Sequence, residues 1–600
     1  MDAYPISAVS HPTDEMEMVI DAQLRKPSMA GTDEKPAIQE RVWGHAARVD
    51  PTVTYEEYIY WAKIEREIEE EEQKKFRAEH GKYPSWISSG SSTESSSAPF
   101  TNEKDTNGEV AAVSSVSEYV DPLKASDAEW RTAARAMRVA SWGQMFFLIT
   151  TDILGWSGAP FVFASVGYGA GVALYIIFGA FATFSGWCIW KVYLELDSSR
   201  YPMMSYGDPF LRLFGKKSRH FINVAQSLQQ FLTVAVLILS KTTNISQISK
   251  RTVCFSGMMA VVLAIGMISG IIRSLTKIGW LSNASVFLNI ANSLIIMVAA
   301  ATYEPFYEAV TRSTLIKTIE PIVVFAGQPP DQYQQQVPGF ASQFTTVNTM
   351  VYAYAGALLF VAFLAEMRHP MDFWKGLFCA QAFICTVYLL FGVFVYSYWG
   401  QYSANNIVNV IRPYPLQTAG NVLTVLTGLI AVFMYFNIGM KTVYLEVFQA
   451  VFGFPPISTR KGKIAWYCLG PIYWILAFVV AASVPNIGGI VSLVGALFMI
   501  DFTYSFPGML LLGHLVQKAA ALPGEGFSPY TRVTTRLDTG MKRWARGFQK
   551  SWKGSAPLTL YVLLGLACCG MGIWAAIEGL ISIFGPDGTV ATAWGCGAPV

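Results

Sequence analysis

Long apolar segments dominate the chain from Ala140 onward, and they alternate with shorter polar loops. Each segment is long enough to cross a hydrocarbon core of ~30 Å, which takes about 20 helical residues. Since lipid cannot satisfy backbone hydrogen bonds, the segments are expected to be helices. The eleven predicted spans are approximately 141–164, 168–192, 219–241, 252–271, 280–302, 345–366, 376–399, 418–440, 464–484, 487–513 and 557–584. The pattern predicts an all-α integral membrane protein with eleven transmembrane helices.

Two of the predicted spans are interrupted in the middle, at matching places in the two halves of the chain. The first contains Gly155-Trp156-Ser157-Gly158-Ala159-Pro160, and the sixth contains Tyr354-Ala355-Gly356-Ala357. Matching Gly/Pro interruptions point to a substrate site built from unwound backbone at mid-membrane. Free amides at the start of a half-helix suit a carboxylate, and free carbonyls at its end suit an ammonium, so together they suit a zwitterion. The alternative for either segment is a simple kink.

The residues before the first span follow a different pattern. Residues 1–125 are expected to form an acidic, largely disordered cytosolic tail with a Ser/Thr-rich linker at 85–115. Within it, the capping-box spacing of Thr54-Tyr55-Glu56-Glu57 opens a charged helix expected to end near Gly81. Its apolar stripe consists of Tyr58, Trp61, Ile64 and Ile68. The sequence leaves open whether this stripe docks on the membrane body or a partner, or belongs to a solvated helix.

Composition and charge support the membrane assignment and orient it. An apolar fraction of 52% and a mean hydropathy of +0.35 over 600 residues exclude a soluble globular protein. The net charge of +2 hides a split, with −11 on residues 1–125 and +13 on the rest. Loops on one side carry 25 Lys and Arg, against 6 on the other. The positive-inside rule then predicts a cytosolic N-terminus. The membrane is expected to be either the plasma membrane or the vacuolar membrane.

Three motifs carry a resemblance to a known family. The first span holds a small-residue run from Asp152 to Pro160, then an apolar stretch ending at Gly167. The tenth holds Val484-Pro485-Asn486 with Ser492-Leu493-Val494-Gly495-Ala496 and Phe506-Pro507, and residues 363–373 form the exit from the sixth. Over about residues 140–584 the chain resembles the amino acid/auxin permease family of transmembrane amino acid transporters, and its long acidic tail resembles those of the fungal members.

The resemblance implies a LeuT-type fold in a transporter domain at 140–584. Two inverted five-helix repeats would span 141–302 and 345–513, followed by an extra helix at 557–584. It also implies amino acid transport by alternating access, coupled to protons or, as the alternative, to sodium. The substrate contacts carried over by position are Leu154, Gly155, Trp156, Ser157, Gly158, Tyr352, Tyr354, Ala355 and Gly356. Trp156 departs from the family pattern, since it places a large side chain among small ones.

Two ionisable residues lie well inside predicted spans, Asp152 and Asp501. A charge at mid-membrane costs ~2.5–3.5 kcal/mol on insertion scales, so each needs a function or a partner. Asp152, three residues before Gly155, is a candidate for the coupling proton or for the substrate ammonium. Its alternative is a capping carboxylate for the helix that restarts after the break. Asp501 is a candidate proton relay, with an interhelical hydrogen bond as its alternative.

Other candidates rest on weaker patterns. Gln226 and Gln229 of the third span and Asn437 of the eighth are secondary polar candidates, with helix-to-helix hydrogen bonds as the alternative. Asn244 begins an N-glycosylation sequon in a predicted outer loop. Among the eight cysteines, only Cys254 and Cys596 are expected to share an external face, and a disulfide between them stays open.

The leading functional hypothesis is an amino acid transporter, and the second is an amino acid sensor that signals through its N-terminal tail. Trafficking or ubiquitination machinery is a further possible partner of the tail, with Lys104 and Lys124 as candidate acceptors. An enzyme is not expected, because the six histidines lie in the tail or at span edges without metal-ligand spacing. No cofactor or metal is expected. Nucleic acid is not expected either, since the basic residues line the cytosolic face and already have a membrane explanation.

Overall fold

The computed structural model describes residues 49–50, 52–80, 138, 140–269, 279–336, 339–449, 452–455, 459–483, 487–584 and 594–597. The predictions for the disordered tail, the Ser/Thr-rich linker, Lys104 and Lys124 lie outside the described residues. The same holds for Val484-Pro485-Asn486 of the tenth-span motif.

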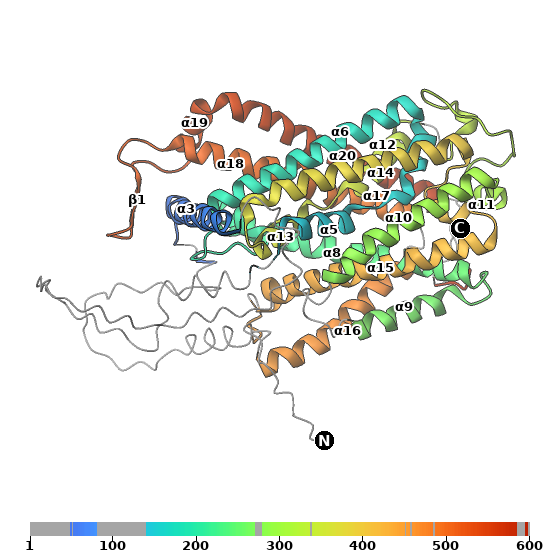
Figure 1. The fold of residues 1–600 in the computed structure, drawn as a ribbon, viewed down its shortest axis with the longest axis horizontal. Helices are drawn as coiled ribbons and strands as arrows, with labels where there is room; N and C mark the ends of the chain where they lie inside the picture. The colour runs from blue at the N-terminus through green and yellow to red at the C-terminus, as the bar shows by residue number, and fades with distance from the viewer. Residues whose placement is uncertain are drawn as a thin grey trace, which may run out of the picture.

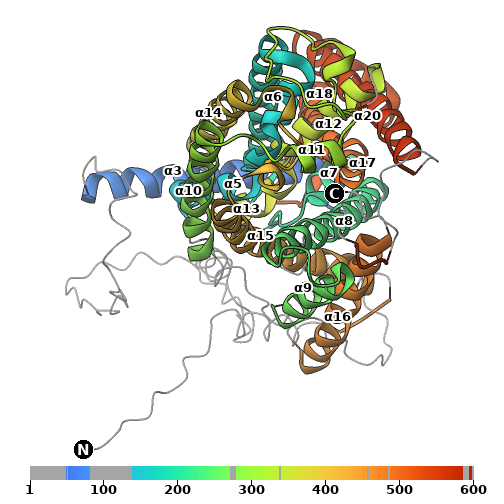
Figure 2. The same ribbon diagram turned by 90° about the vertical axis from the view of Figure 1, so that its right-hand side faces the viewer.

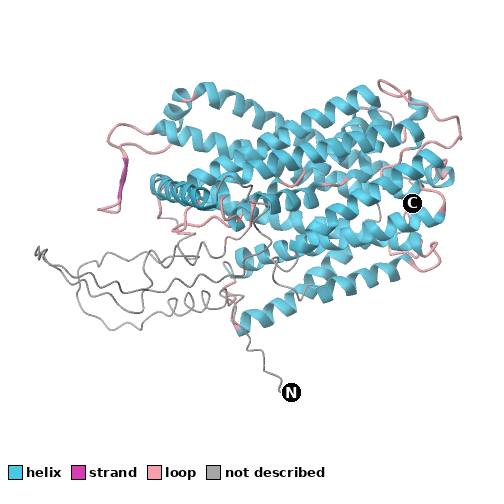
Figure 3. Ribbon diagram, viewed as in Figure 1, coloured by secondary structure: helices cyan, strands magenta, loops and turns pink. Residues whose placement is uncertain are grey.

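The described chain forms a bundle of long helices that run side by side (Figure 1). The single antiparallel hairpin of the described chain pairs β1 (Gly526–Ser528) with β2 (Val533–Thr535), and Gly526 lies opposite Thr535 (Figure 3). Helix α3 (Tyr55–His80) and the hairpin lie at one end of the bundle, here called the α3 end. Helix α11 (Tyr307–Ser313) lies at the other, the α11 end.

The first half of the bundle comprises α5 (Trp142–Ile153), α6 (Ala159–Leu196), α7 (Gly207–Phe214), α8 (Lys216–Ile248), α9 (Phe255–Ser269) and α10 (Gly279–Thr302), with the 3-10 turn η2 (Trp156–Gly158) before α6. The long helix α6 bends at Gly167, where φ is 82°. A Cβ at this residue would lie 2.0 Å from the carbonyl oxygen of Gly327, so only glycine fits. Helix α6 therefore holds the end of the first predicted span and the whole of the second.

The second half comprises α12 (Phe340–Tyr354), α13 (Phe360–Glu366), α14 (Phe373–Trp399), α15 (Tyr414–Val443), α16 (Arg460–Ser483), α17 (Ile487–Val494) and α18 (Phe506–Ala520), followed by α19 (Met541–Lys550) and α20 (Trp552–Phe584). The 3-10 turns are η3 (Asp331–Tyr333), η4 (Ala357–Leu359), η5 (Pro370–Asp372), η6 (Gly400–Tyr402) and η7 (Ile407–Val410). The π-helical turns are η8 (Tyr444–Gln449), η9 (Gly495–Met499) and η10 (Asp501–Ser505). The last two lie within the tenth predicted span, between α17 and α18.

Each of the eleven predicted spans overlaps with helix in the described residues. Nine helical stretches of the described chain are long and apolar enough to cross a membrane, and α9 is a shorter apolar helix. Helix α5 is also short, with 12 residues, because the first span is interrupted. The predicted all-α membrane class is therefore confirmed at this level, while the order of eleven helices in two inverted repeats stays a prediction.

Helices α9 and α16 lie together at the rim of the bundle (Figure 2). The disulfide that the sequence left open is formed here, between Cys254 just before α9 and Cys596. It joins this rim to the described C-terminal residues 594–597. The possibility raised from the sequence is thus confirmed.

Helix α3 docks on the bundle, which decides between the two alternatives for its apolar stripe. Tyr58 is only 2% exposed. Its ring packs edge-on against Tyr201, and the Arg212 guanidinium lies 4.5 Å from its centroid. The Arg200 guanidinium lies 4.5 Å from the ring of Trp61 in the same way. Such cation–π contacts strengthen when they are desolvated. The stripe is an interface with the membrane body.

Hydrogen bonds extend this interface over two loops. The Tyr201 hydroxyl, from the loop after α6, donates to Glu57 at 2.6 Å. The Met371 amide, in the turn between α13 and α14, donates to Glu69 at 3.2 Å. Helix α3 thus bridges a loop from the first half of the bundle to a turn from the second.

Asp197 is the centre of the ion pairs at the α3 end. Its carboxylate is fully buried and lies 3.0 Å from Nη2 of Arg138 and 3.5 Å from Nη2 of Arg66 in α3. Its other oxygen accepts a hydrogen bond from the Met203 amide at 2.9 Å. One carboxylate thus contacts two guanidinium groups, and Arg66 also pairs with Glu69 at 2.7 Å. These ion pairs attach α3 to the bundle at this end.

Candidate functional site

The first interruption is a true break in the helix. Helix α5 ends at Ile153, Gly155 has φ −103° and ψ 55°, and helical geometry resumes at η2. A helix that restarts leaves its first amides without intrahelical acceptors and carries a partial positive charge at that end. The restart at Trp156 is therefore suited to an anionic group.

The second interruption is also a break, and it touches the first. Helix α12 ends at Tyr354, Ala355 has φ −76° and ψ 114°, and helical geometry resumes at η4. A Cβ on Gly356 would lie 2.5 Å from Cγ1 of Ile153 and 2.7 Å from Oδ2 of Asp152. Glycine at this position lets the two breaks meet, so the kink alternative does not hold for either segment.

Tyr388 of α14 ties the two breaks together. Its hydroxyl oxygen accepts a hydrogen bond from the Gly155 amide at 3.0 Å. Its proton lies within reach of two carbonyls, that of Ile153 and that of Ala353, the latter at 2.8 Å. Because a phenol has one proton, it donates to one of these carbonyls at a time. A single buried hydroxyl thus bonds backbone groups of both breaks, and no sequence pattern singled out Tyr388.

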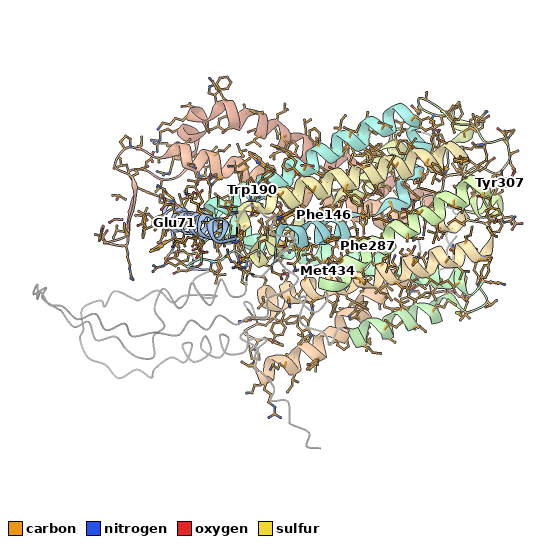
Figure 4. The ribbon with its side chains drawn as sticks, viewed as in Figure 1. Glu71, Phe146, Trp190, Phe287, Tyr307 and Met434 are labelled. Carbon is orange, nitrogen blue, oxygen red and sulfur yellow. A yellow bond between two sulfur atoms is a disulfide. The ribbon has the colours of Figure 1, made fainter. Side chains whose placement is uncertain are left out.

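A cavity of about 720 Å³ lies over the two breaks. It extends toward the α11 end, where its wall includes Thr314 and Gln335. Figure 4 marks that end by Tyr307 and the opposite, α3 end by Glu71 and Trp190. Among the described residues, none of those lining the cavity comes from α3, α7, α13 or α19. The cavity is thus reached from the α11 end and is separated from the α3 end by packed helices.

Most of the predicted substrate contacts line this cavity, namely Leu154, Gly155, Trp156, Ser157, Gly158, Tyr352 and Ala355. Tyr354 and Gly356 lie behind the wall. The Tyr354 hydroxyl donates to the Tyr175 carbonyl at 3.0 Å, and the side chain is fully buried. The Trp156 ring packs on Phe391 with centroids 4.8 Å apart, and it is only 4% exposed. Because the Trp156 ring is packed against Phe391, it leaves more room at the floor of the cavity than it would if it projected into the cavity.

Asp152 lies where the two breaks meet, and it lines the cavity. Both carboxylate oxygens are buried, and neither has a partner within hydrogen-bonding distance and geometry. The phenol of Tyr435, from α15, lies near enough to interact with the carboxylate. No helix amide is capped by this side chain in the described hydrogen bonds. A buried carboxylate in this position is suited to bind a cation, an ammonium or a proton.

The other polar candidates lie away from the cavity. Asp501 lies in η10, where Sγ of Cys569 in α20 is 3.4 Å from its Oδ2. Gln229 touches the wall only indirectly, since its Nε2 lies 3.1 Å from Sδ of Met499. Gln226 and Asn437 are buried within α8 and α15 and do not line the cavity. The structure does not bring these residues together with Asp152.

The polar last turns of α8 continue beyond the predicted span at 219–241. Asn244 lies inside α8 and is fully buried, so the predicted loop placement of the sequon is wrong, and this side chain is inaccessible to glycosylation in the folded protein. Lys241, the last residue of that predicted span, lines the cavity. Low hydropathy in these turns marks an inward-facing surface rather than the end of a helix.

Within the described residues, no group of three or more His, Cys, Asp or Glu side chains is placed to hold a metal ion. The charged residues of the cavity wall are Asp152, Lys241, Arg251 and Glu578. Its neutral hydrogen-bonding groups come mainly from Ser, Thr, Asn and Gln. Such a wall suits a small polar solute better than a lipid or a sterol.

Comparison with known proteins gives one family and several relatives. The sequence model of the family described as "Transmembrane amino acid transporter protein" matches residues 138–522, a range that contains both breaks. A Neurospora crassa protein named "N amino acid transport system protein" is 21% identical over 465 residues, which are 75% of this chain and 86% of that protein. Two proteins named "Transmembrane transporter" are 24% and 23% identical, from Fusarium pseudograminearum and Gibberella moniliformis. The alignments with these two span 50% of this chain and 60% of each relative.

Proposed function

Because this chain belongs to the family of transmembrane amino acid transporter proteins, we propose that it carries amino acids across a membrane through the cavity at the two breaks. One observation carries the proposal: the breaks touch each other at the floor of a cavity of about 720 Å³. The amides at the restart of the first helix suit the substrate carboxylate. Asp152, unpaired beside them, suits the substrate ammonium or a coupling cation.

The proposed architecture is a LeuT-type fold with two inverted five-helix repeats and an extra helix, working by alternating access. Its support is that one broken segment comes from each half, and that the described residues lining the cavity extend to the α11 end and include none from α3, α7, α13 or α19. The balance of Lys and Arg in the loops favours a cytosolic α3 end, so the cavity would face the outside or the vacuolar lumen. In the opposite state, the contacts of α3 and Asp197 would separate.

The proposed coupling ion is a proton carried by Asp152, with sodium as the alternative. The proton would bind the carboxylate together with the substrate from the α11 end and leave it at the α3 end. Neutralising the carboxylate removes the cost of an unpaired buried charge, so the loaded carrier reorients more easily than the unprotonated one. The gradient of the ion then drives the accumulation of the amino acid.

The test is transport by Asp152→Asn, which imitates the protonated carboxyl group. In proteoliposomes, the wild type should accumulate a labelled amino acid when the α11 side is acidic. The variant should exchange the same amino acid across the membrane without accumulating it, and its rate should not depend on pH. Asp501→Asn is the matched control, since this carboxyl group lies outside the cavity. Unchanged accumulation by Asp152→Asn would remove Asp152 from the coupling step.

A second candidate function is an amino acid sensor, and the docking of α3 favours it. A helix that holds one end of the bundle closed would report the state of the cavity to the tail. Deletion of residues 1–120 separates the two functions. A transporter takes up a radiolabelled amino acid in the full-length form and retains uptake at a changed rate after deletion. A sensor shows little uptake in either form.

A further inference from the structure

Lys241 is a cation built into the cavity wall. It lies in the last part of α8, is only 7% exposed, and lines the cavity. Its side chain runs over Gly428 of α15, where a Cβ would lie 2.0 Å from Cε and 2.4 Å from Nζ. Glycine at this position therefore forms the groove that holds the lysine.

Within the part of the chain that the structure describes, the Lys241 ammonium has no ion pair and no hydrogen-bond partner. Arg251 and Glu578 also line the cavity wall, and no described ion pair joins either of them to Lys241. A charge inside a membrane protein is costly unless an opposite charge pairs with it or water solvates it. An unpaired ammonium that faces a cavity is thus an open site for an anion.

The depth of Lys241 separates it from the floor of the cavity. Gly428 lies seven residues before Tyr435, the α15 residue that faces Asp152, so it is about 10 Å nearer the α11 end. The same cavity wall includes neutral polar groups of Thr233, Thr349 and Asn405. A solute with its ammonium at Asp152 would direct its far end toward Lys241.

We propose that Lys241 forms an anion subsite that selects amino acids with a second, side-chain carboxylate. This inference rests on the proposed transport function, and it names the substrate class of the same cavity. The break amides would hold the main-chain carboxylate, Asp152 would face the ammonium, and Lys241 would pair with the side-chain carboxylate. The same ammonium repels basic amino acids. An acidic amino acid such as glutamate is then preferred to its neutral isostere, glutamine.

The experiment measures uptake of glutamate, glutamine and lysine by the full-length protein in proteoliposomes. The variants are Lys241→Gln, Lys241→Glu and the control Lys250→Gln, which changes an exposed lysine stacked on Tyr414 near the same end of α8. In Lys241→Gln, kcat/KM for glutamate should fall at least about tenfold, the effect of ~1.4 kcal/mol, and that for glutamine less than about threefold. Lys241→Glu should gain lysine uptake. Retained glutamine uptake shows that each variant is folded.

Three results would overturn the inference. Equal losses for glutamate and glutamine would mean that Lys241 serves the main-chain carboxylate that both share. No loss for either would mean that water or a small inorganic anion occupies the subsite. Wild-type uptake of glutamine without glutamate would exclude the acidic class while leaving the transport function standing. If the wild type takes up none of the twenty amino acids, the transport function itself fails.

Discussion

The two ends of the bundle differ in whether buried charged side chains have ion-pair partners. At the α3 end, the Asp197 carboxylate is fully buried and pairs with two arginines. Toward the α11 end, the cavity holds Lys241 and Asp152, which form no ion pair within the described chain. Burying a charge is tolerated only when a partner compensates for lost hydration. The buried charge at the α3 end is compensated within the protein, and we infer that a ligand compensates the charges of the cavity.

The largest loss of stability is expected from removing the Asp197 carboxylate at the α3 end. Asp197→Asn removes the carboxylate that pairs with Arg138 and Arg66. Arg66 keeps its pair with Glu69 at 2.7 Å, whereas Arg138 is left without a carboxylate partner among the described ion pairs. Removal of one member of a buried pair costs about 3–5 kcal/mol. We expect a lower thermal unfolding temperature for the protein purified in detergent.

The control for this prediction is Asp372→Asn. Asp372 pairs with Lys375 at 2.5 Å, but the side chains are 17% and 35% exposed. A partly exposed pair of this kind contributes about 0–1 kcal/mol. Equal unfolding temperatures for the two variants would contradict the central place of Asp197 at the α3 end.

The next effect is expected at the junction of the breaks. Tyr388→Phe keeps the ring and removes the hydroxyl that serves Gly155 and the two carbonyls. The Gly155 amide keeps its hydrogen bond to the Ile153 carbonyl at 2.7 Å, whereas the Ala353 carbonyl loses the hydroxyl. A buried backbone group left unsatisfied costs about 1–3 kcal/mol. We expect amino acid uptake to fall by about tenfold or more at equal expression. Tyr396→Phe on the same helix is the control, because its hydroxyl serves only the loop amide of Phe325 among the described hydrogen bonds. Uptake by Tyr388→Phe at the control's level would refute the role of Tyr388.

A third effect tests the contact between the breaks. Gly356→Ala places a methyl group 2.5 Å from Ile153 and 2.7 Å from Asp152, so the breaks must move apart. Overpacking of this kind costs about 1–3 kcal/mol. We expect uptake to fall at least about fivefold. Gly470→Ala is the matched control, because the added methyl meets its nearest neighbour, Phe436, at an ordinary 3.6 Å. If both variants transport normally, the breaks do not need their close contact.

The smallest effect is expected for the pH dependence of stability at the Glu525 carboxyl group, near the α3 end. Desolvation raises the pKa of Glu525, but the amides of Leu522 and Leu537 and the Arg543 guanidinium outweigh it and lower the pKa from 4.5 to about 2. A lowered pKa contributes stability that is full above the unfolded value and is lost as the pH falls through the folded value. Between pH 7 and pH 5, Glu525→Gln should therefore shift the unfolding temperature by a constant amount. A shift that shrinks over this range would contradict the ionised pair.

The membrane class and the two breaks were predictable from the sequence because both depend on local patterns. Apolar length determines which segments can span a membrane. Glycine and proline in the middle of such a segment disfavour continuous helix wherever they stand. The breaks could therefore be predicted without knowing which residues surround them in the fold. They lie at the run from Gly155 to Pro160 and at the pair Ala355-Gly356.

The remaining parts of the site depend on contacts between distant residues. Tyr388 is one tyrosine among 28, and only the fold brings it to both breaks. The stripe of α3 fitted two alternatives until Tyr201 and Arg212 were placed against it. Lys241 and Asn244 follow an apolar run, so hydropathy ended the span at Lys241 and assigned Asn244 to a loop, although both lie in the buried part of α8.

We propose that the substrate lies at the paired breaks and reaches them from the α11 end. The decisive test of this placement is a cysteine at Ser157, which lines the cavity beside the first break. A membrane-impermeant thiol reagent applied from the α11 side should modify Ser157→Cys and stop uptake, against the background of the wild-type cysteines. Transported amino acids should slow this modification, and amino acids that are not transported should leave it unchanged. Modification that no amino acid slows, or that occurs only from the α3 side, would contradict the account.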